Sequence, residues 1–438
     1  MMNFSEFNFH PQVAAGVKAA GYSEPTPIQA EGIPAVMKGD DVMGLAQTGT
    51  GKTAAFALPI LNRLMEGGRG SVRALVIAPT RELAEQIHQA IETLGVETRL
   101  RSMTIYGGVG INPQIQKLKR GVEIVVACPG RLLDHIGQGT IDLSRLEVLV
   151  LDEADMMFDM GFFPDIRKIL ARLPAKRQTL LFSATMPVEI RKLANDVLHH
   201  PVTIQVGTTT AAVTVSHALF PVGQHLKTPL VLELLQHTDT ESVLIFARTK
   251  HRAKRLGEQL EKAGYKAASL QGNLSQNRRQ AALDGFRSGA YQILVATDIA
   301  ARGIDVSQIS HVINYDIPDT PEAYIHRIGR TGRAARTGDA FTMITGEDTG
   351  TVRAIERLLK STIERRTVEG FDYNVAAPSR DVEFARPPRQ STQRRKPAGD
   401  GATGSRGAAS RPKAPGSRGA ASYAPASRPR RPGSRTGN

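Results

Sequence analysis

The sequence predicts an α/β protein with two tandem parallel-sheet domains and a disordered basic C-terminal tail. Short β-branched runs alternate with amphipathic stretches, the alternation stops once and then resumes, and the end of the chain has few large apolar residues. With 438 residues and 41% hydrophobic content, the chain is long enough to bury two separate cores.

Strands that alternate with helices indicate a parallel sheet covered on both faces. The runs that predict strands in the first half are 41–45, 74–78, 123–127, 146–151 and 179–182. Those in the second half are 242–247, 292–296, 311–315 and 340–345. Between the two halves, residues 207–213 are Thr-rich, have small side chains and show no apolar periodicity. We therefore predict a first domain over residues 1–206, a linker over 207–215 and a second domain over 216–370.

The segment 371–438 is rich in Pro, Gly, Ser, Ala and Arg, and it has too few large apolar side chains to offset the entropy cost of ordering. We predict that it is disordered. Residues 376–438 hold 14 basic and 3 acidic residues, most of the net charge of +14. Such a charge favours a polyanionic partner, because each phosphate contact releases counterions. A tail that only aids solubility remains the alternative.

The chain has a single cysteine, Cys128, which excludes an internal disulfide, and zinc-type spacings are absent from the sequence. No apolar run approaches the roughly 20 residues of a membrane span, and the N-terminus does not resemble a signal peptide. We expect a cytoplasmic protein that has no membrane contact.

Residues 46–53 read AQTGTGKT, after one predicted strand and before an amphipathic helix. Glycines at these positions let backbone N–H groups converge on phosphates at a helix N-terminus. Lys52 is predicted to reach the β- and γ-phosphates, and Thr53 to hold Mg²⁺. The usual pattern begins with Gly, so an ordinary Gly-rich turn stays the alternative. The predicted cofactors are ATP and Mg²⁺, and the loop residues are Ala46, Gln47, Thr48, Gly49, Thr50, Gly51, Lys52 and Thr53.

Residues 152–155 read DEAD directly after the predicted strand 146–151. The carboxyl ends of parallel strands are where such sheets bind ligands. We predict that Asp152 holds Mg²⁺ and that Glu153 orients or deprotonates the attacking water. Acidic pairs alone are commonly solvated loop residues, so the prediction depends on this position after the strand.

Together these residues resemble the DEAD-box ATP-dependent RNA helicases of superfamily 2, over about residues 4–345. The resemblance implies two RecA-like domains, RNA-stimulated ATP hydrolysis, and local unwinding of short RNA duplexes when the two lobes close. The compact core and basic tail look most like bacterial RhlE-type members.

The resemblance also implies further nucleotide-site residues. The stretch GYSEPTPIQ at 21–29 is similar to the motif of the family that reads adenine. SAT at 183–185 looks like the element that couples hydrolysis to lobe closure, and HRIGRTGR at 326–333 looks like the final motif with its arginine fingers. The implied adenine and ribose residues are Phe4, Tyr22, Gln29 and Asp305, the fingers are Arg330 and Arg333, and the coupling residues are Asp155, Ser183, Thr185 and His326.

Further motifs resemble the RNA-contacting loops of the family, such as PTRELA at 79–84, PGR at 129–131 and FART at 246–249. The implied contacts are to the RNA backbone, with little reading of base sequence. Cys128 stands where the family usually has Thr, which puts one hydroxyl contact in doubt. The implied RNA-binding residues are Arg81, Gly108, Arg131, Arg248, Gln271, Gly272, Arg279, Thr297 and Gly303.

Two other functions stay open at this point. The same lobes could form a DNA translocase, which equal ATPase stimulation by DNA and RNA would indicate. A non-catalytic RNA annealing or scaffold protein driven by the tail is the other, although complete phosphate, Mg²⁺ and arginine-finger motifs argue against it. The sequence does not identify the RNA target, so ribosomal precursor and RNA-decay assemblies, with a role in ribosome biogenesis, are only candidates.

Overall fold

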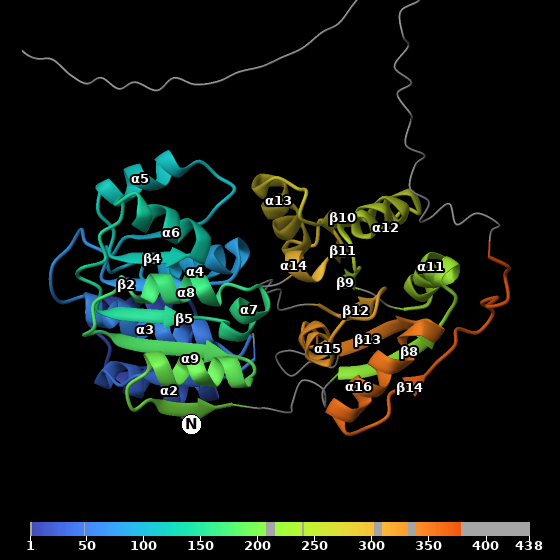
Figure 1. The fold of residues 1–438 in the computed structure, drawn as a ribbon, viewed down its shortest axis with the longest axis horizontal. Helices are drawn as coiled ribbons and strands as arrows, with labels where there is room; N and C mark the ends of the chain where they lie inside the picture. The colour runs from blue at the N-terminus through green and yellow to red at the C-terminus, as the bar shows by residue number, and fades with distance from the viewer. Residues whose placement is uncertain are drawn as a thin grey trace, which may run out of the picture. The chain divides into compact units, whose positions relative to one another are not determined.

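The computed structural model describes residues 2–47, 49–206, 215–238, 241–301, 309–331 and 338–377. These residues form two seven-stranded sheets, each with helices on both faces (Figure 1). The predicted fold class is therefore confirmed. Several predicted features lie outside the described residues: Thr48, Gly303, Asp305, Arg333, the linker residues 207–214 and the tail residues 378–438.

The first lobe contains the first of these sheets, in which every pairing is parallel. Its strands are β1 (Val42–Leu45), β2 (Ala74–Ile77), β3 (Ser102–Ile105), β4 (Ile124–Ala127), β5 (Val148–Leu151), β6 (Gln178–Ser183) and β7 (Val202–Gln205). Its helices are η1 (Phe4–Phe7), α1 (Pro11–Ala19), α2 (Pro27–Lys38), α3 (Lys52–Leu64), α4 (Arg81–Leu94), α5 (Ile111–Lys119), α6 (Pro129–Gly137), α7 (Ala154–Asp159), α8 (Phe163–Leu170) and α9 (Val188–Val197).

The second lobe contains the other sheet, which is also parallel throughout. Its strands are β8 (Val215–Pro221), β9 (Val243–Phe246), β10 (Ala267–Leu270), β11 (Ile293–Ala296), β12 (His311–Asn314), β13 (Gly338–Ile344) and β14 (Glu364–Arg365). Its helices are η2 (Gln224–Leu226), α11 (Lys227–His237), α12 (Lys250–Lys262), α13 (Gln276–Arg287), α14 (Asp298–Ala301), α15 (Pro321–Ile328), η3 (Gly346–Asp348) and α16 (Thr349–Leu359).

The two sheets have the same strand order. The first runs β3-β4-β2-β5-β6-β1-β7, and the second runs β10-β11-β9-β12-β13-β8-β14. Each strand of the second lobe is therefore the counterpart of the strand seven places earlier in the chain. Loops that follow β2, β3 and β4 correspond to loops that follow β9, β10 and β11.

Side chains on successive strand positions enter two different cores in each lobe. Val76 and Val126 belong to one apolar cluster of the first lobe, while Ile77 and Ala127 belong to the cluster on the opposite face. The second lobe is divided in the same way into two clusters. Strands buried on both faces are continuously apolar, which is why the sequence pattern predicted the central strands.

The sequence pattern did not predict β3, β7, β8, β10 and β14. Four of these are the outermost strands of their sheets. An edge strand is partly exposed and carries polar side chains, as in β7, where only Ile204 of the four residues is buried. The apolar runs by which strands were recognised are therefore missing there.

The second lobe continues beyond Gly370, contrary to the predicted boundary. The rings of Phe371 and Tyr373 lie edge-on at 4.8 Å and pack against the apolar core beside β8. The Tyr373 hydroxyl accepts a hydrogen bond from the Val368 N–H at 2.9 Å. Residues 371–377 thus belong to the folded lobe because two aromatic side chains anchor them. Within the described ranges, every helix is too short or too polar to cross a lipid bilayer.

Candidate active site

The phosphate-loop candidate joins β1 to α3, and α3 begins at Lys52. The Lys52 side chain is buried, and its Nζ donates to the carbonyl oxygen of Ala46 at 2.9 Å. This contact closes the loop on itself. Gly51 has a φ of 94°, in the left-handed region that favours glycine. The buried ammonium group of Lys52 therefore lies against the loop that precedes the N-terminus of α3.

Gln29, predicted to read adenine, is tied to this loop. Its Nε2 donates to the carbonyl oxygen of Gly51 at 3.1 Å, and its Oε1 accepts from the N–H of Thr26 at 2.9 Å. The Thr26 hydroxyl donates to the carbonyl oxygen of Thr50 at 2.8 Å. Within the part of the chain that the structure describes, the amide of Gln29 keeps one N–H and one lone pair for a further partner. Thr26 was not predicted, and a capping box in which Gln29 is the third helical residue is the signal that identifies it.

The two predicted aromatic residues have different environments. Phe4 is buried in the core of the first lobe, while the Tyr22 side chain is exposed. Their rings lie edge-on, with centroids 5.5 Å apart. Phe4 is thus placed to support the exposed ring of Tyr22.

Asp152 and Glu153 follow β5 at the carboxyl edge of the first sheet, and both are buried. The N–H of Glu153 donates to Asp152 Oδ1 at 3.0 Å. Glu153 has a φ of 52°, which costs a non-glycine residue about 1–2 kcal/mol. Burial raises the pKa of Asp152 to about 6, against the opposing effect of the Lys52 charge. The lysine and this carboxyl therefore belong to one electrostatic site.

Asp155 and the SAT segment form a hydrogen-bonded unit. Asp155 Oδ2 accepts from the N–H of Ala184 at 3.2 Å, and from the N–H and hydroxyl of Thr185 at 2.9 and 3.0 Å. The Ser183 hydroxyl accepts from the N–H of Asp155 at 3.2 Å. The carbonyl oxygen of Ser183 also accepts from the N–H of Ala46 at 3.0 Å. The loops after β1, β5 and β6 are thus connected directly.

The residues at this edge fit a magnesium nucleotide. Mg²⁺ is usually held by one or two carboxylates, waters and substrate phosphates, and not by a cage of protein ligands. Asp152 offers such a carboxylate within electrostatic reach of the buried ammonium of Lys52, and Thr53, the next residue of α3, would supply a hydroxyl. Among the described residues no group of three or more His, Cys, Asp or Glu side chains could hold a metal ion.

Three predicted RNA-binding residues of the first lobe lie together after β2, β3 and β4. Gly108 has a φ of 80°, which favours glycine, and a Cβ atom there would lie 2.1 Å from Arg81 Nη1, so the Arg81 guanidinium lies directly against this glycine. Arg131 Nη1 donates to the carbonyl oxygen of Val109 at 3.1 Å. Two guanidinium groups therefore flank one glycine loop. This arrangement suits an anionic backbone.

Cys128 lies at the N-cap of α6, just before Arg131 in the PGR segment. Burial raises the pKa of its thiol to about 12, and the charge of Glu82 contributes in the same direction. The thiol is therefore protonated at neutral pH, and it is a weak hydrogen-bond donor compared with a threonine hydroxyl.

The predicted RNA-binding residues of the second lobe follow the counterpart strands. Arg248 follows β9, Gln271 and Gly272 follow β10, and Thr297 follows β11. Gln271 is buried, and its Oε1 accepts from the N–H of Asn273 at 2.7 Å, so its side chain shapes the loop. Arg279 lies in the first turn of α13.

The final motif occupies α15 and the residues after it. His326 lies in the last turn, and the N–H of Arg330 donates to the carbonyl oxygen of Arg327 at 3.1 Å. Arg327 was not predicted as a site residue. It is buried and binds both carboxylate oxygens of Asp298, at 2.5 and 2.6 Å. The available signal in the sequence was that Arg327 lies in a helical turn next to the apolar Ile328.

Comparison with known proteins agrees with this geometry. The profile described as DEAD/DEAH box helicase matches residues 26–193, and that of the helicase conserved C-terminal domain matches residues 226–335. The DEAD-box ATP-dependent RNA helicase CshA of Geobacillus kaustophilus is 44% identical over 366 residues, which cover 83% of this chain and 78% of that protein. The ATP-dependent RNA helicase CshA of Listeria monocytogenes is 42% identical over 395 residues, which cover 90% of this chain and 74% of that protein.

Solved structures give the same result. Dbp5 of S. cerevisiae bound to RNA and ADP BeF3 matches with a TM-score of 0.74 and 30% identity, over 84% of this chain and 96% of that chain. The relatives named here are called CshA, so the expected resemblance to RhlE-type members is not supported. Sequence profiles, relatives and fold together show that this chain is an enzyme of the DEAD-box RNA helicase family.

Proposed function

We propose that this chain is an RNA-stimulated ATPase that separates short RNA duplexes when ATP and RNA bring its two lobes together. The observation that carries the proposal is the cluster at the carboxyl edge of the first sheet, where the buried Lys52 lies within electrostatic reach of Asp152 and Glu153 follows directly. In this proposal Lys52 binds the β- and γ-phosphates, Glu153 orients the attacking water, and Gln29 with Tyr22 contacts the adenine.

Bound Mg²⁺ would neutralise charge on the phosphates, and Asp152 and Thr53 are the residues proposed to hold it. Arg330 and Arg333 are proposed as fingers from the second lobe, and Asp305 as a ribose contact. Fingers supplied by a separate lobe make hydrolysis wait for closure, and they increase rates by roughly 10³ to 10⁵ in other phosphoryl-transfer enzymes. We expect open lobes to hydrolyse ATP slowly.

The RNA partner is proposed from the two sets of loops after equivalent strands. Arg81, Gly108 and Arg131 follow β2, β3 and β4, while Arg248 and Thr297 follow the counterpart strands β9 and β11. Matching loops in two lobes can bind successive phosphates of one strand. Gln271, Gly272, Arg279 and Gly303 are proposed for the same surface. Dbp5, with its RNA-bound structure, is a relative in which RNA is the ligand.

Strand separation is proposed to be local. If the closed lobes bend one strand, a wedge that acts against roughly 1.4 kcal/mol per stacked pair can undo only a few steps. We therefore expect short duplexes to dissociate and long ones to resist. The domain boundaries are proposed as 1–206, 207–214 and 215–377, because Val215 begins β8 and does not belong to the predicted linker. The basic tail that follows is proposed to anchor the enzyme on RNA.

Two substitutions test the site. Lys52→Ala and Glu153→Gln are expected to abolish RNA-stimulated ATP hydrolysis, whereas Lys18→Ala and Glu97→Gln, at exposed positions outside the motifs, should retain it. Phosphate release is measured with and without single-stranded RNA, and with single-stranded DNA of equal length. Normal turnover in either site variant would refute the proposed site, and equal stimulation by DNA would favour a DNA translocase.

A further inference from the structure

Two loops of the second lobe correspond to the phosphate loop and the acidic loop of the first. Helix α11 begins at Lys227 after β8, as α3 begins at Lys52 after β1, and a threonine follows each lysine. Asp316 comes soon after β12, as Asp152 comes directly after β5. One strand separates the two loops in each sheet, β6 in the first and β13 in the second. The second lobe thus keeps a lysine and an acid at the places of a nucleotide site.

Protein groups occupy this place in the second lobe. Lys227 is 2% exposed, and its Nζ donates to the carbonyl oxygen of Tyr315 at 2.9 Å and lies 3.5 Å from Asp316 Oδ1. Val222 and Leu226, between β8 and α11, are buried in the apolar core. The connecting segment therefore packs into the lobe, where a Gly-rich loop would leave room for phosphates.

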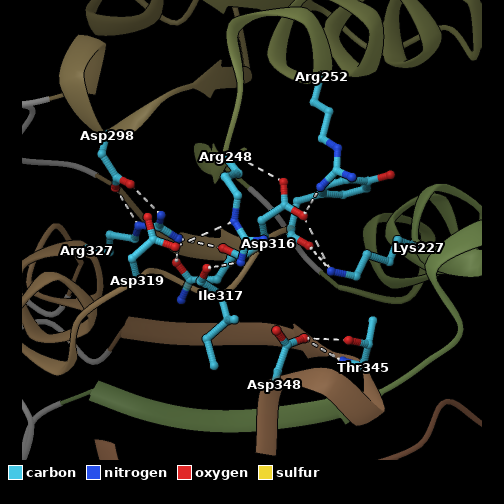
Figure 2. A network of polar contacts seen from close by, with 12 residues as sticks. Lys227, Arg248, Arg252, Asp298, Asp316, Ile317, Asp319, Arg327, Thr345 and Asp348 are labelled. Carbon is cyan, nitrogen blue, oxygen red and sulfur yellow. Dashed lines mark hydrogen bonds and ion pairs between the residues drawn. The ribbon is translucent and has the colours of Figure 1, made fainter. Parts of the chain in front are cut away.

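Asp316 is the centre of a set of converging donors, as Figure 2 shows. Its Oδ2 accepts from the backbone N–H of Arg248 at 2.8 Å, and its Oδ1 accepts from Arg252 Nη1 at 2.7 Å. The carboxylate is 2% exposed, and hydrogen bonds to a buried charged acceptor are among the stronger ones in proteins. The segment 246–249, which contains the proposed RNA-binding Arg248, is therefore held through its main chain.

The same loop is held from its other side. Arg327 Nη1 donates to the carbonyl oxygen of Asp316 at 2.6 Å and to Asn314 Oδ1 at 3.1 Å, while its other nitrogens bind Asp298. Asp298 directly follows Thr297 in the chain. The network of Figure 2 thus connects the loops after β9, β11 and β12.

We propose that Lys227 and Asp316 form a degenerate counterpart of the first lobe's phosphate site, in which the ion pair replaces the nucleotide and Asp316 positions the Arg248 loop to bind RNA. Asp316 acts on RNA through the main chain of Arg248, so it is a positioning residue. This inference rests on the proposed RNA contact of Arg248.

The test compares a buried with an exposed carboxylate near the same arginine. Asp316→Asn is expected to weaken binding of a single-stranded RNA of about ten nucleotides roughly tenfold, measured by fluorescence anisotropy with a non-hydrolysable ATP analogue. Asp319 lies 3.7 Å from Arg248 Nε, but its side chain is 85% exposed, so Asp319→Asn should change the affinity less than twofold. The affinity for the ATP analogue in the absence of RNA should stay the same in both variants, which separates the effect from a general loss of structure.

A second variant separates positioning from stability. Replacing the pair with apolar side chains of similar size removes both buried charges together. The double variant Lys227→Met with Asp316→Leu also takes the acceptor away from the N–H of Arg248, so its unfolding temperature is expected to fall by a few degrees. At a temperature where both chains are folded, it is expected to bind RNA about tenfold more weakly than the unmodified chain. Because Asp316 acts through the Arg248 loop, its effect should not add to that of Arg248→Ala.

Each outcome is decisive. A double variant that matches the unmodified chain in both thermal midpoint and RNA affinity would overturn the proposal, and so would full additivity of Asp316→Asn with Arg248→Ala. If the unmodified chain itself neither binds RNA nor is stimulated by it, the proposed function fails, and the two failures are thus distinguished.

Discussion

Asp155 and Thr185 are joined by two hydrogen bonds, in which one carboxylate oxygen of Asp155 accepts from both the backbone N–H and the hydroxyl of Thr185. Ala184 donates to the same oxygen. The contacts connect the acidic loop after β5 with the loop after β6. Movement of the acidic loop when nucleotide binds or leaves can therefore be passed to the SAT segment.

This connection predicts a graded response to substitution. Thr185→Val removes the hydroxyl bond alone, whereas Asp155→Ala removes all three bonds, so we expect a small loss of RNA-stimulated kcat in the first and a loss of about tenfold or more in the second. Steady-state hydrolysis at saturating RNA measures both. If both variants hydrolysed ATP at the rate of the unmodified chain, the contacts would not couple the loops.

A glycine substitution tests the link between Gln29 and the phosphate loop. A Cβ atom at Gly51 would lie 2.4 Å from Gln29 Nε2, and the φ of 94° disfavours any other residue. We expect Gly51→Ala to weaken binding of a fluorescent ATP analogue at least tenfold. Gly32→Ala, in helix α2, is the matched control. A Cβ atom at Gly32 would lie no closer than 3.7 Å to its nearest neighbours, the side chains of Ala55 and Ile204, so this variant should bind the ATP analogue with unchanged affinity.

The sequence predicted the fold, and the positions of the two candidate nucleotide loops after their strands, because both depend on local pattern. Continuous apolar runs identify central strands, and the AQTGTGKT and DEAD segments each lie at the end of one such strand. The edge strands β3, β7, β10 and β14 were missed because partial exposure removes that pattern. Their places in the sheets come from pairing, which sequence periodicity does not report.

The supporting contacts of the site could not be predicted, because they join residues far apart in the chain. Gln29 and Gly51, or Arg248 and Asp316, meet only after the sheets have formed. Lys227 gave one local signal, a Lys-Thr pair that repeats Lys52 and Thr53. Only the identical strand order of the two sheets shows that the two Lys-Thr pairs occupy equivalent positions.

The raised pKa of Asp152 predicts a pH dependence of nucleotide binding. Burial favours the neutral carboxyl, so the folded chain binds this proton more tightly than the unfolded chain, whose pKa is near 3.8. The resulting contribution to stability is full below the unfolded value and is lost as the pH rises through about 6. Magnesium binding has the opposite preference, because it needs the carboxylate.

Affinity for magnesium ATP should therefore increase as the pH is raised through about 6. Titration calorimetry from about pH 5 to about pH 8 measures this change. Asp152→Asn should bind more weakly and show a flatter profile. An unmodified chain whose affinity is constant over the same range would contradict the role given to this carboxyl.

Cys128 is predicted to be chemically inert in the folded chain. With a thiol pKa of about 12, roughly one molecule in ten thousand carries the thiolate at pH 8, and the thiolate is the reactive form. Iodoacetamide should modify the native chain far more slowly than the chain in denaturant, as followed by mass spectrometry. Because the chain has one cysteine, any thiol modification seen in the mass spectrum belongs to Cys128. Equal rates would mean that the thiol is accessible and ionised.

Truncation of the chain after residue 377 and truncation after Gly370 are expected to have different outcomes. Removal of residues 378–438 takes away the basic tail but leaves the packed Phe371 and Tyr373, so thermal stability and RNA-stimulated hydrolysis should be kept. RNA affinity should fall, and its dependence on salt should flatten by roughly 0.7 in the logarithmic slope for each RNA phosphate that the tail would otherwise neutralise.

Truncation after Gly370 removes both aromatic side chains as well. These residues cover part of the core beside β8, and their loss should cost about 2 kcal/mol and lower the midpoint of thermal unfolding. Calorimetry of the two truncated chains compares them directly. If both truncated chains unfolded at the same temperature, the segment 371–377 would contribute nothing to the stability of the lobe. If the chain without residues 378–438 kept full RNA affinity and salt dependence, the proposed anchoring role of the tail would be wrong.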